Sequence, residues 1–308
     1  MSTVTEYYGI TGPVPFINVE IKEDNRLYLD PHAVRLTRSP QPFAGDAVHC
    51  ADTFLAEITH CVISRTRTSL DRAERLLQRF GEPWETRLGM SEAGFHGHGG
   101  AEVVGTWILD TLTDDVEALI RVAVLRHLED LPLFVDGVDR DITSDITTRI
   151  IYGPLARFTE AMIATYPQFR GNDHEVRRFR RQVWDPAKRE WAVETFILPV
   201  ANGKPLLLVP KGWARRTLLM SATRYYETSV LTYAQLERAV MGSDGKLIRT
   251  PKDRLKSERD LARGRATNLN VTLRAFENEQ DLLAVFKAFV ASKFEPEVEM
   301  GGDENAVA

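Results

Sequence analysis

EVRRFRRQVWDPAKREWAVETFILPVANGKPLLLVP, residues 175–210, is the stretch that decides the fold. From about residue 175 the sequence takes on the two-residue period of half-buried β-strands. The segment PAKR separates the first run from the second, and Asn202-Gly203 separates the second from the third. Asn-Gly between apolar runs is a strong hairpin signal, because both residues tolerate positive φ. The pattern therefore predicts an antiparallel β-meander over about 175–210.

The Asn202-Gly203 turn also predicts which residues face each other. If Ala201 pairs with Lys204, continuing the register outward places Glu194 opposite Lys211. This pair is either a plain cross-strand ion pair or the catalytic half of a nuclease site. In the nuclease, Glu194 would bind metal and Lys211 would polarise a phosphate or water. The usual Glu-x-Lys of such cores is missing from VETF, so the site would be a variant.

The remaining elements are one more hairpin, one isolated strand and several helices. VPFINVE (14–20) and RLYLD (26–30) are predicted strands joined by a turn, and Pro31 is expected to end the second. LPLFV (131–135) reads as a short buried strand. Helical patterns cover the following segments, the fifth interrupted at Gly153-Pro154: 47–64, 69–80, 101–112, 114–128, 144–166, 221–241 and 272–292.

Strands and helices in separate runs predict an α+β fold rather than a regularly alternating one. We expect an N-terminal β-hairpin and the meander to be surrounded by helices. Residues 1–295 are predicted to form a single domain, with a subdivision near 170–176. The acidic, apolar-poor segment 296–308 is expected to be a disordered tail.

Composition places the chain among ordinary globular proteins, with 43% hydrophobic and 27% charged residues. No stretch approaches the roughly 20 apolar residues that span a bilayer. The N-terminus lacks a secretory pattern and two cysteines cannot build a disulfide framework, so we expect a cytoplasmic protein with no membrane partner.

The net charge of −5 conceals a polarised chain. Residues 1–176 hold 16 Lys/Arg and 27 Asp/Glu, whereas residues 177–265 hold 20 Lys/Arg and 9 Asp/Glu. Two explanations stay open: the basic segment binds a polyanion such as nucleic acid, or it packs against the acidic half. For the first, the predicted phosphate contacts are Arg254, Lys256 and Arg259.

The densest acidic cluster is LFVDGVDRDITSD (133–145). Asp136 ends the predicted strand, and Asp141 and Asp145 follow in the loop and next helix. Carboxylates that converge at a strand end suit Mg²⁺, so Asp136, Asp141 and Asp145 are the predicted metal ligands. The alternative is that these aspartates form turns and cap the helix.

The glycine-rich loop GFHGHGG (94–100) allows three interpretations. Gly97, Gly99 and Gly100 permit close backbone approach, and the following helix would aim its free N–H groups at a phosphate. His96 and His98 could instead share a metal ion. The third interpretation is a surface loop without a ligand.

Three blocks resemble a poorly characterised bacterial protein family: residues 81–100, residues 128–160 and GKPLLLVPK (203–211). We associate that family with phage-defence and mobile-element neighbourhoods. The resemblance implies a bacterial, intracellular setting and a role directed at nucleic acid. It assigns no catalytic residues.

Together these features predict a metal-dependent nuclease or phosphodiesterase that acts on nucleic acid with Mg²⁺. The first alternative is a non-catalytic protein that binds nucleic acid, a protein partner or a second copy of itself. The second is a nucleotide-binding sensor that uses the glycine-rich loop.

Overall fold

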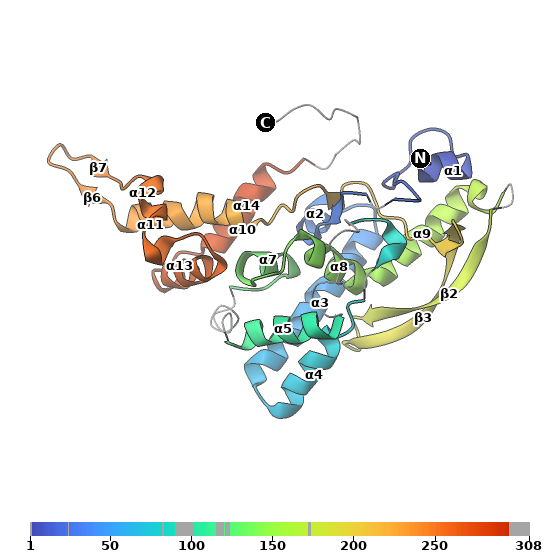
Figure 1. Cartoon of the computed structure of the whole chain (residues 1–308), viewed down its shortest axis with the longest axis horizontal. Helices are drawn as coiled ribbons and strands as arrows, with labels where there is room; N and C mark the ends of the chain where they lie inside the picture. Colours follow the sequence, from blue (N-terminus) through green and yellow to red (C-terminus); the bar gives the residue numbers. More distant parts are fainter. Residues whose placement is uncertain are drawn as a thin grey trace.

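The two longest strands are those that the alternating segment predicts. In the computed structural model, β2 (Val176–Asp185) and β3 (Glu190–Ala201) pair antiparallel along their length and curve beside helix α9 (Tyr152–Thr165) (Figure 1). Trp184 and Trp191 face each other across the pair with ring centroids 5.7 Å apart. Both rings pack on Phe54, so one end of this ribbon joins the core.

The structure describes residues 2–23, 25–81, 83–89, 101–114, 120, 124–171 and 174–295. The elements before β2 are α1 (Val4–Tyr8), β1 (Tyr28–Leu29), α2 (Pro31–Thr37), α3 (Phe43–Ser64), α4 (Arg67–Leu77), η1 (Trp84–Thr86), α5 (Ala101–Asp114), η3 (Leu128–Asp130), α7 (Leu131–Phe134), α8 (Arg140–Ile150), α9 and η4 (Pro167–Arg170). Those after β3 are β4 (Lys204–Pro205), β5 (Ala214–Arg215), α10 (Ala222–Tyr225), the π-helical turn η5 (Tyr226–Val230), α11 (Leu231–Glu237), β6 (Val240–Met241), β7 (Leu247–Ile248), α12 (Lys252–Lys256), η6 (Arg259–Leu261), α13 (Arg265–Glu277) and α14 (Leu282–Ser292). The chain is therefore an α+β protein, with small antiparallel sheets among helices.

The Asn-Gly turn forms as predicted, but the third strand of the meander is short. Asn202 and Gly203 have φ of 55° and 72°, and Ala201 pairs with Lys204. One more ladder bond follows, from the Leu206 N–H to the Pro199 carbonyl at 2.9 Å, and the bonds after it would join Ile197 and Leu208. Instead, the Ile197 N–H donates to Glu160 Oε1 at 2.8 Å and the Leu208 N–H donates to Thr159 Oγ1 at 3.0 Å. Two adjacent side chains of α9 thus replace the strand pairing and end the sheet at Pro205.

Replacing Gly203 by Val is expected to lower the free energy of unfolding by about 1–2 kcal/mol, because an L-residue with a Cβ resists the left-handed region. A Cβ at Gly203 would meet no atom within 4 Å, so the backbone angle alone sets the cost. Denaturant unfolding of Gly203→Val measures it. Gly203→Asn is the control, since Asn tolerates positive φ. Equal stability of Gly203→Val and the parent would contradict the turn.

The predicted N-terminal hairpin is wrong. Residues 14–20 and 26–30 do not pair with each other; each pairs with the segment that follows β4. The Ile17 N–H donates to the Val209 carbonyl at 2.8 Å, and β1 pairs with β5. The short segment before Lys211 therefore lies against the N-terminal residues. A turn between two apolar runs does not reveal a third, distant run that competes for the same backbone groups.

Two other predicted elements also differ from the structure. LPLFV is the helical turn α7, with Pro132 in its first turn, and not a strand; periodicity alone cannot separate a short buried helix from a strand. The segment 272–292 is divided between α13 and α14, with Glu279 at a φ of 59° in the connection. The predicted break near Gly153-Pro154 is confirmed at the junction of α8 and α9.

One hydrophobic cluster runs from Val4 in α1 to Val290 in α14. Helices α10, α11, α13 and α14 gather at one end of the molecule, and the β6–β7 hairpin projects from them (Figure 1). The four hairpin side chains Val240, Met241, Leu247 and Ile248 are exposed on both faces, by 60%, 69%, 45% and 57%. No helix of the described residues is long and apolar enough to cross a membrane.

Candidate functional site

The aspartates predicted to bind Mg²⁺ occupy different environments around α7 and α8. Asp136 is exposed and forms an ion pair with Arg265 at 3.6 Å. Asp139 caps α8 by accepting the N–H groups of Asp141 and Ile142 at 3.0 and 3.1 Å. Asp145 lies one helical turn after Asp141 in α8 and is buried. The capping alternative is thus confirmed for Asp139.

These carboxylates are not brought together as a metal centre. Within the described part of the chain, no group of three or more His, Cys, Asp or Glu side chains is placed to hold a metal ion. The prediction placed Asp136 at the end of a rigid strand, but α7 is a helical turn. The strand end on which the convergence of Asp136, Asp141 and Asp145 was expected is therefore not formed, and Mg²⁺ binding stays a prediction.

The predicted pairing of Glu194 with Lys211 is wrong. Glu194 lies opposite Arg181 of β2, and its carboxylate forms an ion pair with Arg157 of α9 at 3.1 Å. The Lys211 N–H donates to the Pro15 carbonyl at 3.0 Å. The two residues separate because the chain leaves β3 after Leu206 and pairs with the N-terminal segment.

The glycine-rich loop falls outside the described residues. This applies to the predicted phosphate ligands Gly97, Gly99 and Gly100 and to His96 and His98. Helix α5 begins at Ala101, as the sequence predicts. The phosphate, metal and ligand-free interpretations all stay predictions.

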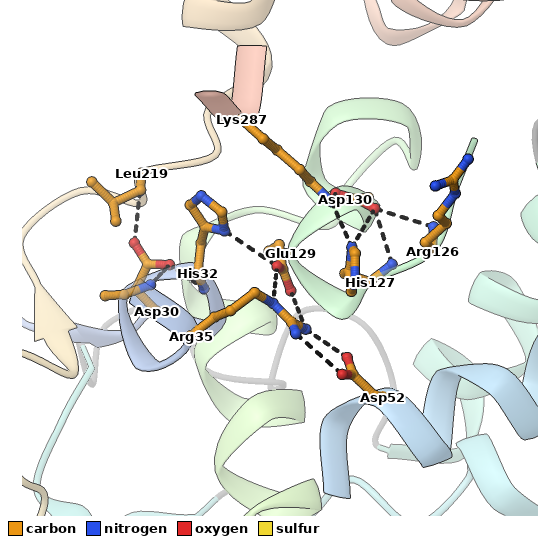
Figure 2. A network of polar contacts seen from close by, with 11 residues as sticks. Asp30, His32, Arg35, Asp52, Arg126, His127, Glu129, Asp130, Leu219 and Lys287 are labelled. Atoms are coloured by element: carbon orange, nitrogen blue, oxygen red, sulfur yellow. Dashed lines mark hydrogen bonds and ion pairs between the residues drawn. The ribbon is translucent and has the colours of Figure 1, made fainter. Parts of the chain in front are cut away.

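A buried cluster of charged side chains, which the sequence did not single out, connects α2, α3, η3 and α14 (Figure 2). Asp30 is the N-cap of α2: its carboxylate accepts the N–H groups of His32 and Ala33, and that of Leu219 at 2.7 Å. Burial raises the pKa of Asp30, while these hydrogen bonds act to lower it. Asp30 therefore ties the start of α2 to the segment that leads into α10.

Glu129 is the centre of the cluster. Its side chain is 1% exposed and accepts from Arg35 Nε at 2.7 Å, while His32 Nδ1 lies 3.2 Å away. Burial acts to raise the pKa of Glu129, but the His32 and Arg35 contacts overcome it and hold the pKa far below its usual range. Arg35 also forms a two-point contact with Asp52 of α3, at 2.5 and 3.1 Å. Two side chains of α2, Arg35 and His32, thus contact the Glu129 carboxylate.

Asp130, the next residue, is completely buried and has different partners. Its Oδ2 accepts the backbone N–H groups of Arg126 and His127 at 3.2 and 3.0 Å. Its Oδ1 lies 2.6 Å from Lys287 Nζ of α14, a close ion pair without hydrogen-bond geometry. Burial raises the pKa of Asp130 despite this lysine. Two adjacent acids are therefore neutralised from opposite sides of η3.

The contacts in this cluster neutralise buried carboxylates and hold the helices that carry them in place. Each carboxylate is committed to cations or to backbone N–H groups, while His32 Nε2 has no hydrogen-bond partner in the described structure. One sequence signal was available: Asp30 followed by Pro31 is an N-cap and first-turn pair. The strand pattern predicts that Pro31 ends a strand, but in the structure it begins α2.

The basic segment 177–265 forms ion pairs both with the acidic half of the chain and within itself. Among the described residues, four of its side chains reach acids of residues 1–176: the pairs are Arg177–Glu175, Arg181–Glu85, Arg189–Glu57 and Arg265–Asp136. Eight of the nine acids within the segment also form ion pairs: Asp185, Glu194, Glu227, Glu237, Asp244, Asp253, Glu258 and Asp260. The acids of this segment are therefore largely neutralised.

Of the three predicted phosphate contacts, two stay free of acids. Arg254 and Arg259 are exposed and form no ion pair with a described residue. Lys256 instead lies 2.9 Å from Glu227 and 3.6 Å from Asp253, which raises its pKa. Lys256 therefore differs from Arg254 and Arg259, because its charge is already paired with acids.

Comparison with known proteins gives one match. A family model described as a domain of unknown function (DUF8370) covers residues 11–221, more than half of the chain. No curated protein and no solved structure matches the chain. The matched residues include Asp30, Glu129 and Asp130 of the buried cluster but end before Lys287. The chain therefore belongs to the DUF8370 family.

Proposed function

We propose that this protein binds nucleic acid through exposed basic side chains of residues 177–265, without cleaving it. The supporting observation is the charge left over after ion pairing. Among the described residues, twelve cations of this segment have no acidic partner: Arg178, Arg180, Lys204, Lys211, Arg215, Arg216, Arg224, Arg249, Lys252, Arg254, Arg259 and Arg263. Unpaired surface cations attract a polyanion and release its counterions on binding.

Five of these cations form what we call the C-terminal basic surface: Arg224, Arg249, Arg254, Arg259 and Arg263, all exposed. They lie on α10, next to β7, on α12 and around η6. Arg263 hydrogen-bonds Thr223, which brings the residues after η6 beside α10. Arginine suits phosphate because its planar fork donates two parallel hydrogen bonds.

Cleavage is left out of the proposal because its expected residues are committed elsewhere. Asp136 pairs with Arg265 and Glu194 pairs with Arg157, while Lys211 lies against the N-terminal segment instead of opposite Glu194. Binding through phosphate contacts requires only an accessible positive surface.

The test is a salt titration of binding to a fluorescent duplex and to a single strand, with EDTA present throughout. We expect the parent to bind both. Arg254→Ala with Arg259→Ala should reduce the slope of log K against log salt by about 0.9 per lost duplex contact and about 0.7 per lost single-strand contact. The affinity loss should be similar for any base sequence.

Arg75→Ala with Arg79→Ala is the matched control, because it removes the same charge from exposed residues in and just after α4. This control should keep the parental slope. The proposal fails if the parent does not bind at about 50 mM salt, where phosphate contacts are strong. It also fails if the control lowers the slope as much as the Arg254/Arg259 variant.

A further inference from the structure

The contact between Lys287 and η3 joins a helix outside the matched family segment to residues inside it. Lys287 Nζ lies 2.7 Å from His127 Nδ1 and 2.6 Å from Asp130 Oδ1 (Figure 2). Asp130 is completely buried, and the Lys287 side chain is 19% exposed. Part of the cluster therefore depends on α14 being seated against η3.

The geometry determines the protonation state of His127. A lysine ammonium has three donors and no acceptor, so Nδ1 must be the unprotonated acceptor. The Asp130 N–H donates to the His127 backbone carbonyl at 3.0 Å, so Lys287 is the donor that faces Nδ1. With Lys287 donating to Nδ1, the ring is neutral and carries its proton on Nε2. A proton on Nδ1 would displace Lys287 and place a second cation beside it.

The other polar contacts between α13 and the family segment do not titrate near neutral pH. Arg265 donates to the Pro132 and Val138 carbonyls at 3.0 and 3.2 Å, and Asn268 Nδ2 donates to the Leu133 carbonyl at 3.0 Å. Guanidinium and amide groups keep their charge over the physiological range, whereas histidine does not. His127 is thus the described group here whose protonation can change near neutral pH.

We propose that Lys287, His127 and Asp130 form a pH-sensitive latch that holds α14 against the family segment and opens when His127 is protonated. The inference is independent of the proposed function. It predicts that mild acid loosens the C-terminal helices while the rest of the fold stays intact.

The surroundings of His127 support the sign of this effect. Burial lowers the pKa of His127 below its ordinary value of 6.5; Glu129 and Asp130 act to raise it, while Lys287 and Arg35 act to lower it. When the pKa of a histidine is lower in the closed state than in the open state, the histidine favours the closed state. This contribution is complete at pH values above the ordinary histidine pKa. The stabilisation is lost as pH falls below about 6.5. Protonation of Asp130, whose pKa burial raises, acts in the opposite direction.

The experiment is amide hydrogen exchange of α14 at about pH 7.5 and pH 5.5, corrected for the intrinsic rate. If opened His127 has its ordinary pKa and closed His127 stays neutral at pH 5.5, one unit below that ordinary value favours opening about tenfold. We therefore expect protection of residues 282–292 to fall about tenfold in the parent at the lower pH. His127→Gln should lose this response, because an amide oxygen still accepts from Lys287 but does not titrate. Any response from Asp130 is common to both proteins.

His49→Gln is the matched control, since His49 is exposed on α3, and it should keep the parental response. Lys287→Met should show low protection of α14 already at the higher pH. The latch is refuted if the parent has equal protection at both values, or if His127→Gln retains the acid response. Loss of the response in His49→Gln would refute it as well.

Discussion

Glu129→Leu is expected to lower the free energy of unfolding by about 3–5 kcal/mol, because removing one partner of a buried pair strands the other charge. Glu129 accepts from Arg35 and contacts His32 while its side chain is 1% exposed. Its loss leaves Arg35, itself 22% exposed, with Asp52 alone. Urea unfolding followed by tryptophan fluorescence measures the change in midpoint and slope.

Asp52→Leu is the control for this prediction. Asp52 contacts the same guanidinium at two points but is 39% exposed. Exposed ion pairs contribute about 0–1 kcal/mol, so the Asp52 variant should stay close to the parent. If both variants lost the same free energy of unfolding, burial would not determine how much each ion pair contributes to stability.

Gly105→Ala is expected to destabilise the protein by about 1–3 kcal/mol, the usual cost of overpacking. At Gly105, α5 touches the end of α4: an added Cβ would lie 2.5 Å from the Leu77 carbonyl oxygen and 2.9 Å from the Gln78 nitrogen. These are backbone atoms, so one helix must move. Alanine favours an isolated helix by about 1 kcal/mol over glycine, so helix propensity alone predicts the opposite sign.

The control is Gly153→Ala in α9, where the added Cβ meets the end of the flexible Arg157 side chain at 3.2 Å. That variant should equal the parent or gain up to about 1 kcal/mol. Thermal or urea unfolding of both variants decides the matter. A Gly105→Ala protein as stable as the parent would show that α4 and α5 do not meet this closely.

The candidate site illustrates the limits of sequence patterns. Asp136, Asp141 and Asp145 are close in the sequence, and their spacing suggested one metal site. In the fold, Asp139 caps α8, Asp136 pairs with Arg265, and no group of three acids is placed to hold a metal ion among the described residues. The charged cluster that does form combines Asp30, Arg35, Asp52, Glu129 and Lys287. Those residues are scattered over most of the chain, and no local spacing connects them.

The basic segment was easier to anticipate, because charge is a property of the sequence itself. An excess of Lys/Arg over Asp/Glu in residues 177–265 must appear somewhere on the surface or in ion pairs. Which cations stay free depends on the fold: Lys256 meets Glu227, a residue before α11, whereas Arg254 and Arg259 do not meet an acid among the described residues.

By itself the sequence determined the features that depend on neighbouring residues. These include the β2–β3 hairpin, the positive φ values of Asn202 and Gly203, and the helix break near Gly153. Each follows from local sterics and from the period of the apolar positions. Tertiary structure alone decided where the meander ends, because Thr159 and Glu160 of α9 bind the N–H groups that a third strand needed. It also decided that Lys211 joins the N-terminal segment and that Lys287 neutralises Asp130. A backbone or charged group takes whichever partner the packed fold brings within reach, and that choice is not encoded in its neighbours along the chain.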